Sequence, residues 1–213
     1  MAMIKAQYET RTTAPTMSDV KEKQLILRRR QFEEGTPDQF LLEQTVIGVM
    51  PHQFFQTFRK VYETQHIWNQ HLKSCELFDK DGDTEIIITI FKSPALFVAS
   101  RIVMDGVYLN EDKEKSEYMS IFSSIGNEDY WEDYVRQNDI SDYAVAKSVI
   151  SGHWFRPLYN PQNETEIIGT SVFYLNQADL GGNIPTWLKT TFAPKAIVDG
   201  WESLAAYCQK NPK

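Results

Sequence analysis

The sequence predicts an α+β fold, in which a curved antiparallel sheet of about nine strands packs against a long C-terminal helix. Strand-like segments follow one another in hairpins, and they do not alternate with helices as the strands of parallel sheets do. Helical periodicity is confined to the region after the second strand and to the chain from Asp179 onward. A sheet of this size twists and curls strongly, so we expect the terminal helix to lie across its concave face.

The chain from Asp179 onward carries two sets of apolar residues, each forming one stripe along a helix. Pro194 removes a backbone donor and disfavours α conformation at Ala193, so we expect a kink or break there. Gly200 either weakens the second half, by roughly 1 kcal/mol relative to alanine, or lets the helix approach the sheet closely. The two stripes are Ile184, Trp187, Leu188, Thr191 and Phe192, and Ile197, Trp201, Leu204, Ala205 and Cys208.

Residues 1–16 are polar and threonine-rich and predict a flexible N-terminal segment, so residues 17–213 are interpreted as a single domain. Pro51 suits the first turn of a helix, and apolar residues at helical spacing continue it to Tyr62. The segment 126–142 is acidic and aromatic and is expected to hold at most a helical turn. The predicted strands cover residues 24–32, 40–49, 75–79, 84–92, 97–109, 117–125, 143–150, 152–158 and 166–179.

Charge and cysteine content exclude several classes of function. The formal net charge is −7 and the pI is about 5.2, which argues against nucleic-acid binding and against permanent electrostatic docking on anionic membranes. Cys75 and Cys208 form no CxxC pair, so neither a zinc site nor a disulfide scaffold is expected. The N-terminus lacks the apolar region of a signal peptide, and no apolar run is long enough to span a bilayer. We therefore expect a cytoplasmic protein.

No motif for nucleotide binding or nucleophilic catalysis is present: the chain lacks GxGxxG, GxxxxGK[ST] and GxSxG. His66 and His71 are five residues apart, a spacing that does not align them on one helix face as a zinc site requires. Most carboxylates fall in turns, where solvation explains them. We therefore predict no catalytic residues, no cofactor and no metal.

Large apolar and aromatic residues are abundant on the strands and the last helix, without an accompanying catalytic signature. A curved sheet with a helix across its mouth can leave an apolar pocket of about 300–1,000 Å³. The alternative is that these side chains fill a solid core. Composition alone does not decide between them.

In its order of motifs the chain resembles the START domain, the lipid-transfer module named after the steroidogenic acute regulatory protein. A tryptophan follows the first internal helices in HIWNQHLKSCELFDKDGDTEIIITIF (66–91), a strand begins with SRIV (100–103), and another ends in YMSIFSS (118–124). GHWFRP (152–157) matches a Gly-x-x-x-x-Pro segment, and DLGGNIP (179–185) matches the closing Asp-x-x-Gly-x-x-Pro turn before the last helix. The sequence GGNIPTWL is most similar to the phosphatidylcholine-transfer branch.

The resemblance implies a helix-grip fold, in which the sheet grips the C-terminal helix around an internal apolar cavity. It also implies non-enzymatic binding of a single lipid, expected here to be a phospholipid, and its transfer between membranes by a monomer in transient membrane contact. Ile102 stands where the family has an acid after its arginine. The buried Arg–Glu pair of sterol-binding members also has no evident match, which argues against cholesterol.

We predict that Arg101 or a tyrosine hydroxyl lies near the lipid headgroup. The C-terminal helix, hinged at Pro194 and Gly200, would form the gate together with the turn at 110–116. Two alternatives stay open: an enzyme of the wider helix-grip superfamily, which needs His153 or an unpaired carboxylate inside the cavity, and an interaction module that docks through the aromatic residues of 126–142. The predicted cavity walls are Met104, Tyr108, Phe122, Phe155, Tyr174, Trp187 and Phe192.

Overall fold

The computed structural model describes residues 25–33, 35–182, 184–185 and 188–212. The segment 1–16, predicted to be flexible, and Trp187, predicted to line the cavity, lie outside the described residues. The strands are β1 (Leu25–Arg30), β2 (Gln39–Ile47), β3 (Leu72–Asp81), β4 (Thr84–Phe91), β5 (Ser100–Asp112), β6 (Glu117–Ser123), β7 (Tyr143–Val145), β8 (Lys147–Asn160) and β9 (Asn163–Asp179). The helices are α2 (Pro51–Arg59), α3 (Val61–Trp68), α4 (Glu128–Gln137), the π-helix η2 (Leu188–Phe192) and α5 (Ala193–Lys210).

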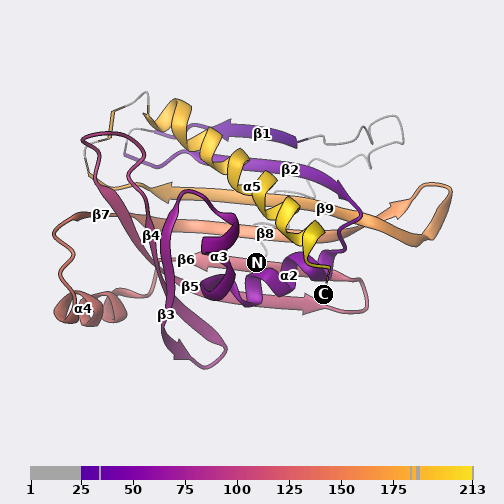
Figure 1. Ribbon diagram of the computed structural model, residues 1–213, viewed down its shortest axis with the longest axis horizontal. Coiled ribbons are helices and arrows are strands. Elements are labelled where there is room, and N and C mark those ends of the chain that lie inside the picture. The colour runs from indigo at the N-terminus through magenta and orange to yellow at the C-terminus, as the bar shows by residue number, and fades with distance from the viewer. Residues whose placement is uncertain (1–24, 34, 183, 186–187, 213) are drawn as a thin grey trace.

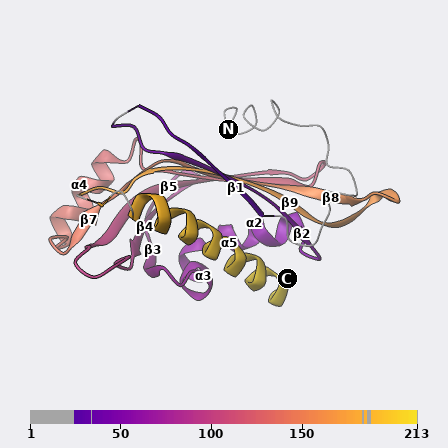
Figure 2. The same cartoon turned by 90° about the horizontal axis from the view of Figure 1, so that it is seen from above.

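All nine of these strands belong to one sheet, in the order β1-β2-β9-β8-β6-β5-β4-β3, with β7 paired to β5. The pairs are antiparallel except β5–β7, which is parallel. Helices α2, α3 and α5 lie on one face of the twisted sheet, and α5 crosses that face obliquely (Figures 1 and 2). This confirms the predicted α+β architecture with a sheet wrapped around the C-terminal helix.

The main core lies between the inner face of the sheet and helices α2 and α5. Alternate residues of each strand point to it, because side chains of a strand alternate between faces. Phe54 of α2 stacks on Phe155 of β8 at 5.1 Å between ring centroids, and Trp201 and Leu204 of α5 are buried in the same cluster. The apolar stripe predicted for the C-terminal helix therefore packs toward the sheet.

Helix α4 covers the outer face of the sheet at one end, and it is a full helix of ten residues where only a turn was predicted. Its Tyr134 is buried among Ile86 and Ile102, and Tyr130 and Trp131 pack against the same cluster. The aromatic side chains of segment 126–142 therefore pack on the protein itself. Tyr130 and Trp131 stay partly exposed, so the alternative that this segment docks a partner stays a prediction.

Two other expectations for the chain also differ from the structure. Strand β8 runs unbroken through Gly152, which pairs with Ile121 and Leu175 on its two sides, so the predicted separation into two strands at that glycine is wrong. Helix α5 begins at Ala193, directly after the π-helix η2, and Pro194 is its second residue. Where the sequence predicted a kink or break at Pro194, the structure has a change from π-helix to α-helix.

Candidate functional site

A cavity of about 330 Å³ separates the N-terminal half of α5 from the inner face of the sheet. Strands β4, β5, β6, β8 and β9 supply one wall, and α3 and α5 supply the other. The backbone of α5 approaches α2 and α3 more closely than it approaches the strands, which leaves this space between helix and sheet. The residues therefore do not pack into a solid core, and the open question left by the composition is answered in favour of a cavity.

Stacked rings close the inner end of the cavity. The His153 ring lies 4.3 Å from the ring of Phe58 and 4.7 Å from that of Tyr174, measured between centroids, and Trp201 of α5 lies 5.5 Å from both His153 and Tyr174. Phe155 continues this row away from the cavity, where it is fully buried under α2. The aromatic row gives the cavity a rigid, largely apolar floor.

Strand β5 alternates between the two faces of the sheet. Arg101, Val103 and Asp105 line the cavity, whereas Ile102 and Met104 point to the outer face and pack beside α4. The period-two alternation of a strand thus places Met104 on the face opposite to the one predicted for it.

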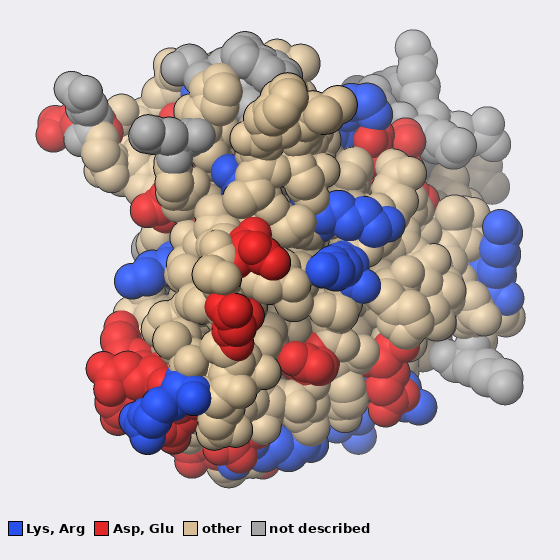
Figure 3. Space-filling view, turned by 60° about the vertical axis from the view of Figure 1, so that its left-hand side comes forward, with Lys and Arg blue, Asp and Glu red and all other residues tan. Residues whose placement is uncertain are grey.

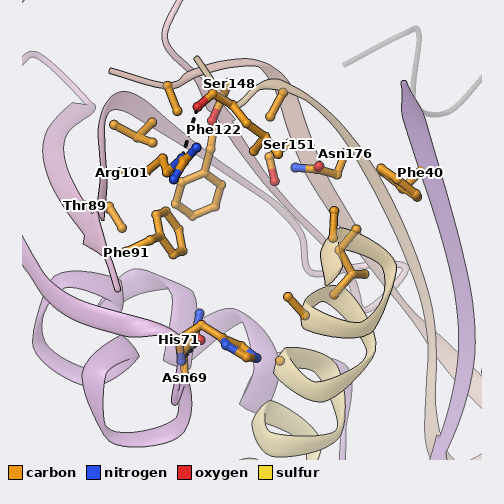
Figure 4. A pocket seen from close by; sticks show the side chains of 18 of the residues that line it. Phe40, Asn69, His71, Thr89, Phe91, Arg101, Phe122, Ser148, Ser151 and Asn176 are labelled. Atoms are coloured by element: carbon orange, nitrogen blue, oxygen red, sulfur yellow. Dashed lines mark hydrogen bonds between the residues drawn. The ribbon is translucent and has the colours of Figure 1, made fainter. Parts of the chain in front are cut away.

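Arg101 is a buried guanidinium, only 7% exposed, at the cavity wall. Its Nη1 donates to the carbonyl of Ala99, and its Nε donates to the carbonyl of Leu180 at 3.4 Å. No carboxylate of the described residues forms an ion pair with it. Burial lowers the pKa of Arg101, but an arginine keeps its charge in proteins. The cavity wall therefore presents a positive charge at Arg101 (Figure 4).

Asp105 is held in the wall by two serine hydroxyls. Ser124 donates to its Oδ1 at 2.8 Å and Ser148 donates to its Oδ2 at 3.0 Å. β8 has one extra residue, Val149, relative to β9, and this bulge directs Ser148 as well as Ser151 toward the cavity. Burial raises the pKa of Asp105 to about 6, and the two hydroxyls oppose that rise only in part.

His153 is a neutral aromatic part of the wall. Its Nδ1 lies 2.9 Å from the hydroxyl of Ser120, and burial lowers the pKa of the imidazole to about 3. The ring is therefore uncharged at neutral pH and behaves as a flat polar surface between Phe58 and Tyr174.

A second polar group of residues lies across the cavity from Arg101, Ser148 and Asn176, at the junction of α3 and β3 (Figure 4). His71 there connects to the C-terminal helical region: its Nε2 is 3.6 Å from Asp199 Oδ2, and its ring meets that of Phe192 edge-on at 5.6 Å. Asp199 also pairs with Lys195 at 2.5 Å. His71 thus contacts the cover of the cavity, although its Nε2 makes no hydrogen bond among the described residues.

The family model of the START domain matches residues 17–213, nearly the whole chain. The chain belongs to the START domain family. Comparison with curated protein sequences finds no significant match. Membership supports lipid binding and transfer as the general class of function.

Solved structures of START domains share the fold at low sequence identity. Human StAR-related lipid transfer protein 5 superposes with a TM-score of 0.71 at 13% identity, covering 100% of this chain and 94% of that chain. Human STARD10 gives 0.70 at 14% identity, covering 94% and 82%. The STAR-related lipid transfer protein of Xanthomonas axonopodis gives 0.65 at 14%, covering 89% and 99%. At these identities the likeness shows the fold.

The predicted ligand-contact residues divide into two groups within this START domain. Arg101, Phe122, Tyr174 and Phe192 line the cavity, and contact of these four with a ligand stays a prediction. Tyr108 is half exposed and, like Met104 and Phe155, lies outside the lining. The sequence analysis missed Asp105, although alternation from Arg101 along one strand points to it, and it missed Ser148, whose orientation depends on a bulge.

The predicted gate residues also differ in position. Gly200 lines the cavity, and a Cβ built on it would meet no atom within 4 Å, so close approach to the sheet does not explain this glycine. Pro194 lies outside the lining, in the first turn of α5. The turn at 110–116 contributes no lining residue, so a role for it beside the gate finds no support.

The closing turn of the family motif contributes Leu180 to the cavity lining beside Arg101. Gly181 has a φ of +62°, and a Cβ there would lie 1.9 Å from the carbonyl oxygen of Val145. Only glycine fits both the left-handed backbone and this close approach to β7. The turn therefore brings the Leu180 carbonyl to Arg101 Nε.

Neither a metal site nor a membrane-spanning helix is found in the part of the chain that the structure describes. No group of three or more His, Cys, Asp and Glu side chains there is placed to hold a metal ion. No described helix is long and apolar enough to cross a membrane.

Proposed function

We propose that this START domain binds one phospholipid in the cavity under α5 and transfers it between membranes as a non-enzymatic monomer. The observation that carries the proposal is the cavity itself, a mainly apolar space between sheet and helix. Each lipid CH₂ kept from water is worth about 0.8 kcal/mol, so a chain of sixteen carbons costs on the order of 12 kcal/mol in water. A cavity as apolar as the bilayer makes extraction nearly isoenergetic.

The charge at Arg101 supports a phosphate-bearing lipid. The guanidinium is buried and faces the cavity, and no described carboxylate pairs with it. An arginine fork suits two oxygens of one phosphate, and the surrounding low dielectric strengthens that contact. Ser151 and Asn176 line the same region and add polar groups for the headgroup or the ester linkages.

Entry of a lipid requires α5 to move, because the cavity of about 330 Å³ lies at the lower end of ligand pockets and a two-chain lipid needs more room. Gly200 lies on the cavity side of α5 with open space around it, and α5 rests mainly on α2 and α3. We therefore assign the gate to the N-terminal half of α5, with Gly200 as its flexible point.

Native mass spectrometry after incubation with phosphatidylcholine vesicles tests the binding. We expect the protein to carry one lipid per chain. Ala196→Phe places a ring in the cavity and should abolish uptake, whereas Ala206→Phe, on an exposed position of the same helix, should leave it unchanged. Wild-type protein that stays empty with phospholipids, sterols and ceramides would refute lipid transfer. Light scattering of the same sample measures the molar mass and so tests the proposed monomeric state.

Comparison of phosphatidylcholine with diacylglycerol, which lacks the phosphate, tests the headgroup assignment. Wild-type protein should load phosphatidylcholine preferentially. Arg101→Gln should remove that preference while the chain still takes up diacylglycerol. An unchanged preference in the variant would contradict a role for Arg101 in headgroup binding.

An enzyme on the same fold is the second candidate, and Asp105 is the observation that favours it. A buried carboxylate whose pKa is about 6 is a possible general base, and it lies in the cavity wall. Both of its oxygens, however, accept hydrogen bonds from serines, and His153 has a pKa of about 3. Mass analysis of lipid recovered after long incubation decides: a chemically altered lipid that Asp105→Asn no longer produces would establish the enzyme.

A further inference from the structure

The sheet wall of the cavity holds two buried charges of opposite sign that do not pair with each other. Arg101 and Asp105 both line the cavity, and each residue is only 7% exposed. They are four positions apart on β5, so they share one face of the strand with about 13 Å between their Cα atoms, at about 3.3 Å per residue. None of the ion pairs among the described residues includes either side chain. A buried charge without a counter-charge costs free energy, so this wall suits a ligand that carries both signs.

Hydrogen bonds hold the two charged groups apart. The Arg101 guanidinium donates to the carbonyl of Ala99, directly before β5, and to that of Leu180, directly after β9. The Asp105 carboxylate accepts from two serine hydroxyls, at 2.8 and 3.0 Å. The pairing of β5 with β4 is regular from Arg101 to Asp105, without a bulge that would bring the two residues closer. The strand itself therefore fixes the separation between the positive and the negative group.

The carboxylate of Asp105 has acceptor sites left for a ligand. Each of its oxygens accepts one hydrogen bond from a serine, and a carboxylate offers about four lone-pair sites in all. Burial raises the pKa of Asp105 to about 6, so most of the carboxylate is ionised at pH 7.5. Lys92, which also lines the cavity, already donates from its Nζ to the carbonyl of Gln70 at 2.8 Å. Asp105 is therefore matched to a cation with N–H groups that arrives with the ligand.

We propose that Asp105 binds the ammonium group of an ethanolamine phospholipid while Arg101 binds the phosphate of the same headgroup. This rests on the proposed phospholipid binding and adds the headgroup class to it. The ethanolamine nitrogen carries N–H donors, whereas a choline nitrogen carries no hydrogen and meets Asp105 through its charge alone. Hydrogen bonds to charged groups are about twice as strong as neutral ones, so Asp105 favours ethanolamine over choline.

The selection is expected from the cavity and not from the surface of the domain. Acidic and basic side chains are interspersed on the face shown in Figure 3, so this face sorts headgroups only weakly by charge. Inside the cavity the low dielectric strengthens the attraction of Asp105 for a cation and its repulsion of an anionic lipid. For lipids with the same acyl chains, we expect affinity to fall from phosphatidylethanolamine to phosphatidylcholine and then to phosphatidic acid.

Competition between phospholipids with identical acyl chains, read by native mass spectrometry at pH 7.5, tests the ammonium site. The vesicles contain equal amounts of phosphatidylethanolamine, its N,N-dimethyl form and phosphatidylcholine. Occupancy of the wild type should fall about tenfold or more from the dimethyl form, which keeps one N–H, to phosphatidylcholine, which keeps none. Asp105→Asn should bring these occupancies close to equal. Asp83→Asn, on an exposed turn, removes the same single charge from the net of −7 and should keep the wild-type ratios.

Phosphatidic acid gives a second readout, which a loss of folding cannot imitate. This lipid has the phosphate but no cation, so Asp105→Asn should load it several-fold better than the wild type does. Equal loading of phosphatidylethanolamine and phosphatidylcholine by the wild type would overturn the ammonium site and leave phospholipid binding intact. The same conclusion would follow if Asp105→Asn kept the wild-type ratios or failed to gain phosphatidic acid. Wild-type protein that loads none of these phospholipids would instead overturn the proposed function.

Discussion

Asp105→Asn removes a buried charge from the cavity wall while keeping the shape of the side chain. Burial raises the pKa of Asp105 from 3.8 to about 6, so between pH 4 and 6 the folded protein holds a proton that the unfolded chain releases. The resulting stability is fully present below about pH 4 and is lost as the pH rises through 6. A difference of about 2 in pKa corresponds to at most about 3 kcal/mol.

We therefore expect the variant and the wild type to unfold at similar urea concentrations near pH 3.5. At pH 7.5 the variant should be more stable by up to about 3 kcal/mol, because the amide can still accept from Ser124 and donate to the hydroxyl of Ser148. His153 acts in the opposite direction, since its low pKa costs stability as the pH falls below 6.5, but it is present in both proteins and cancels. Asp83→Asn, on an exposed turn, is the control.

Tryptophan fluorescence in urea, measured at intervals from pH 3.5 to 7.5, gives the two stability profiles. A difference between Asp105→Asn and wild type that does not change with pH would refute the reasoning, because it would show that Asp105 titrates alike in the folded and unfolded chains.

Three other substitutions test the cover of the cavity and its closing turn. Gly200→Ala should raise the free energy of unfolding by about 1 kcal/mol and slow lipid transfer between vesicles; transfer at the wild-type rate would remove Gly200 from the gating mechanism. Asp199→Asn removes the carboxylate charge that faces both His71 and Lys195 and should speed transfer, with a stability loss under about 1 kcal/mol because both pairs are partly exposed; slower transfer would contradict a role of Asp199 in holding the cover. Gly181→Ala should cost more than about 2 kcal/mol in urea unfolding, and Gly182→Ala, which shares the positive φ without the close contact, should cost less; equal costs would show that the approach to Val145 does not matter.

Much of the fold could be predicted from the sequence, because hairpin turns and the apolar stripe of the C-terminal helix are local signals. The antiparallel sheet and the C-terminal helix across it agree with the prediction, whereas the pairing of β2 with β9 and of β6 with β8 was not predicted. Other features, such as where a strand ends, depend on contacts with neighbouring strands. Gly152 looked like a strand boundary, but neighbours on both sides pair with it and keep β8 continuous.

The site was harder to predict, because it depends on which way each strand faces. Arg101 and Met104 were both assigned to the cavity although they are three residues apart on one strand, a spacing that places them on opposite faces. Consistent use of the alternation identifies Val103 and Asp105 instead. Ser148 was beyond such reasoning, since the bulge at Val149 changes the phase of β8. Asp105 accepts hydrogen bonds from Ser124 and Ser148. Its environment therefore also depends on the bulge at Val149, which no local sequence pattern indicates.

The aromatic floor of the cavity has a practical consequence for observing the protein at work. Trp201 and Trp68 line the cavity, whereas Trp154 is buried in a separate cluster on the outer face of the sheet. When an apolar chain replaces water beside the two cavity indoles, their emission should shift to shorter wavelength while that of Trp154 stays constant. The domain thus carries its own optical reporter of occupancy, and loading and release can be followed in real time without a labelled lipid.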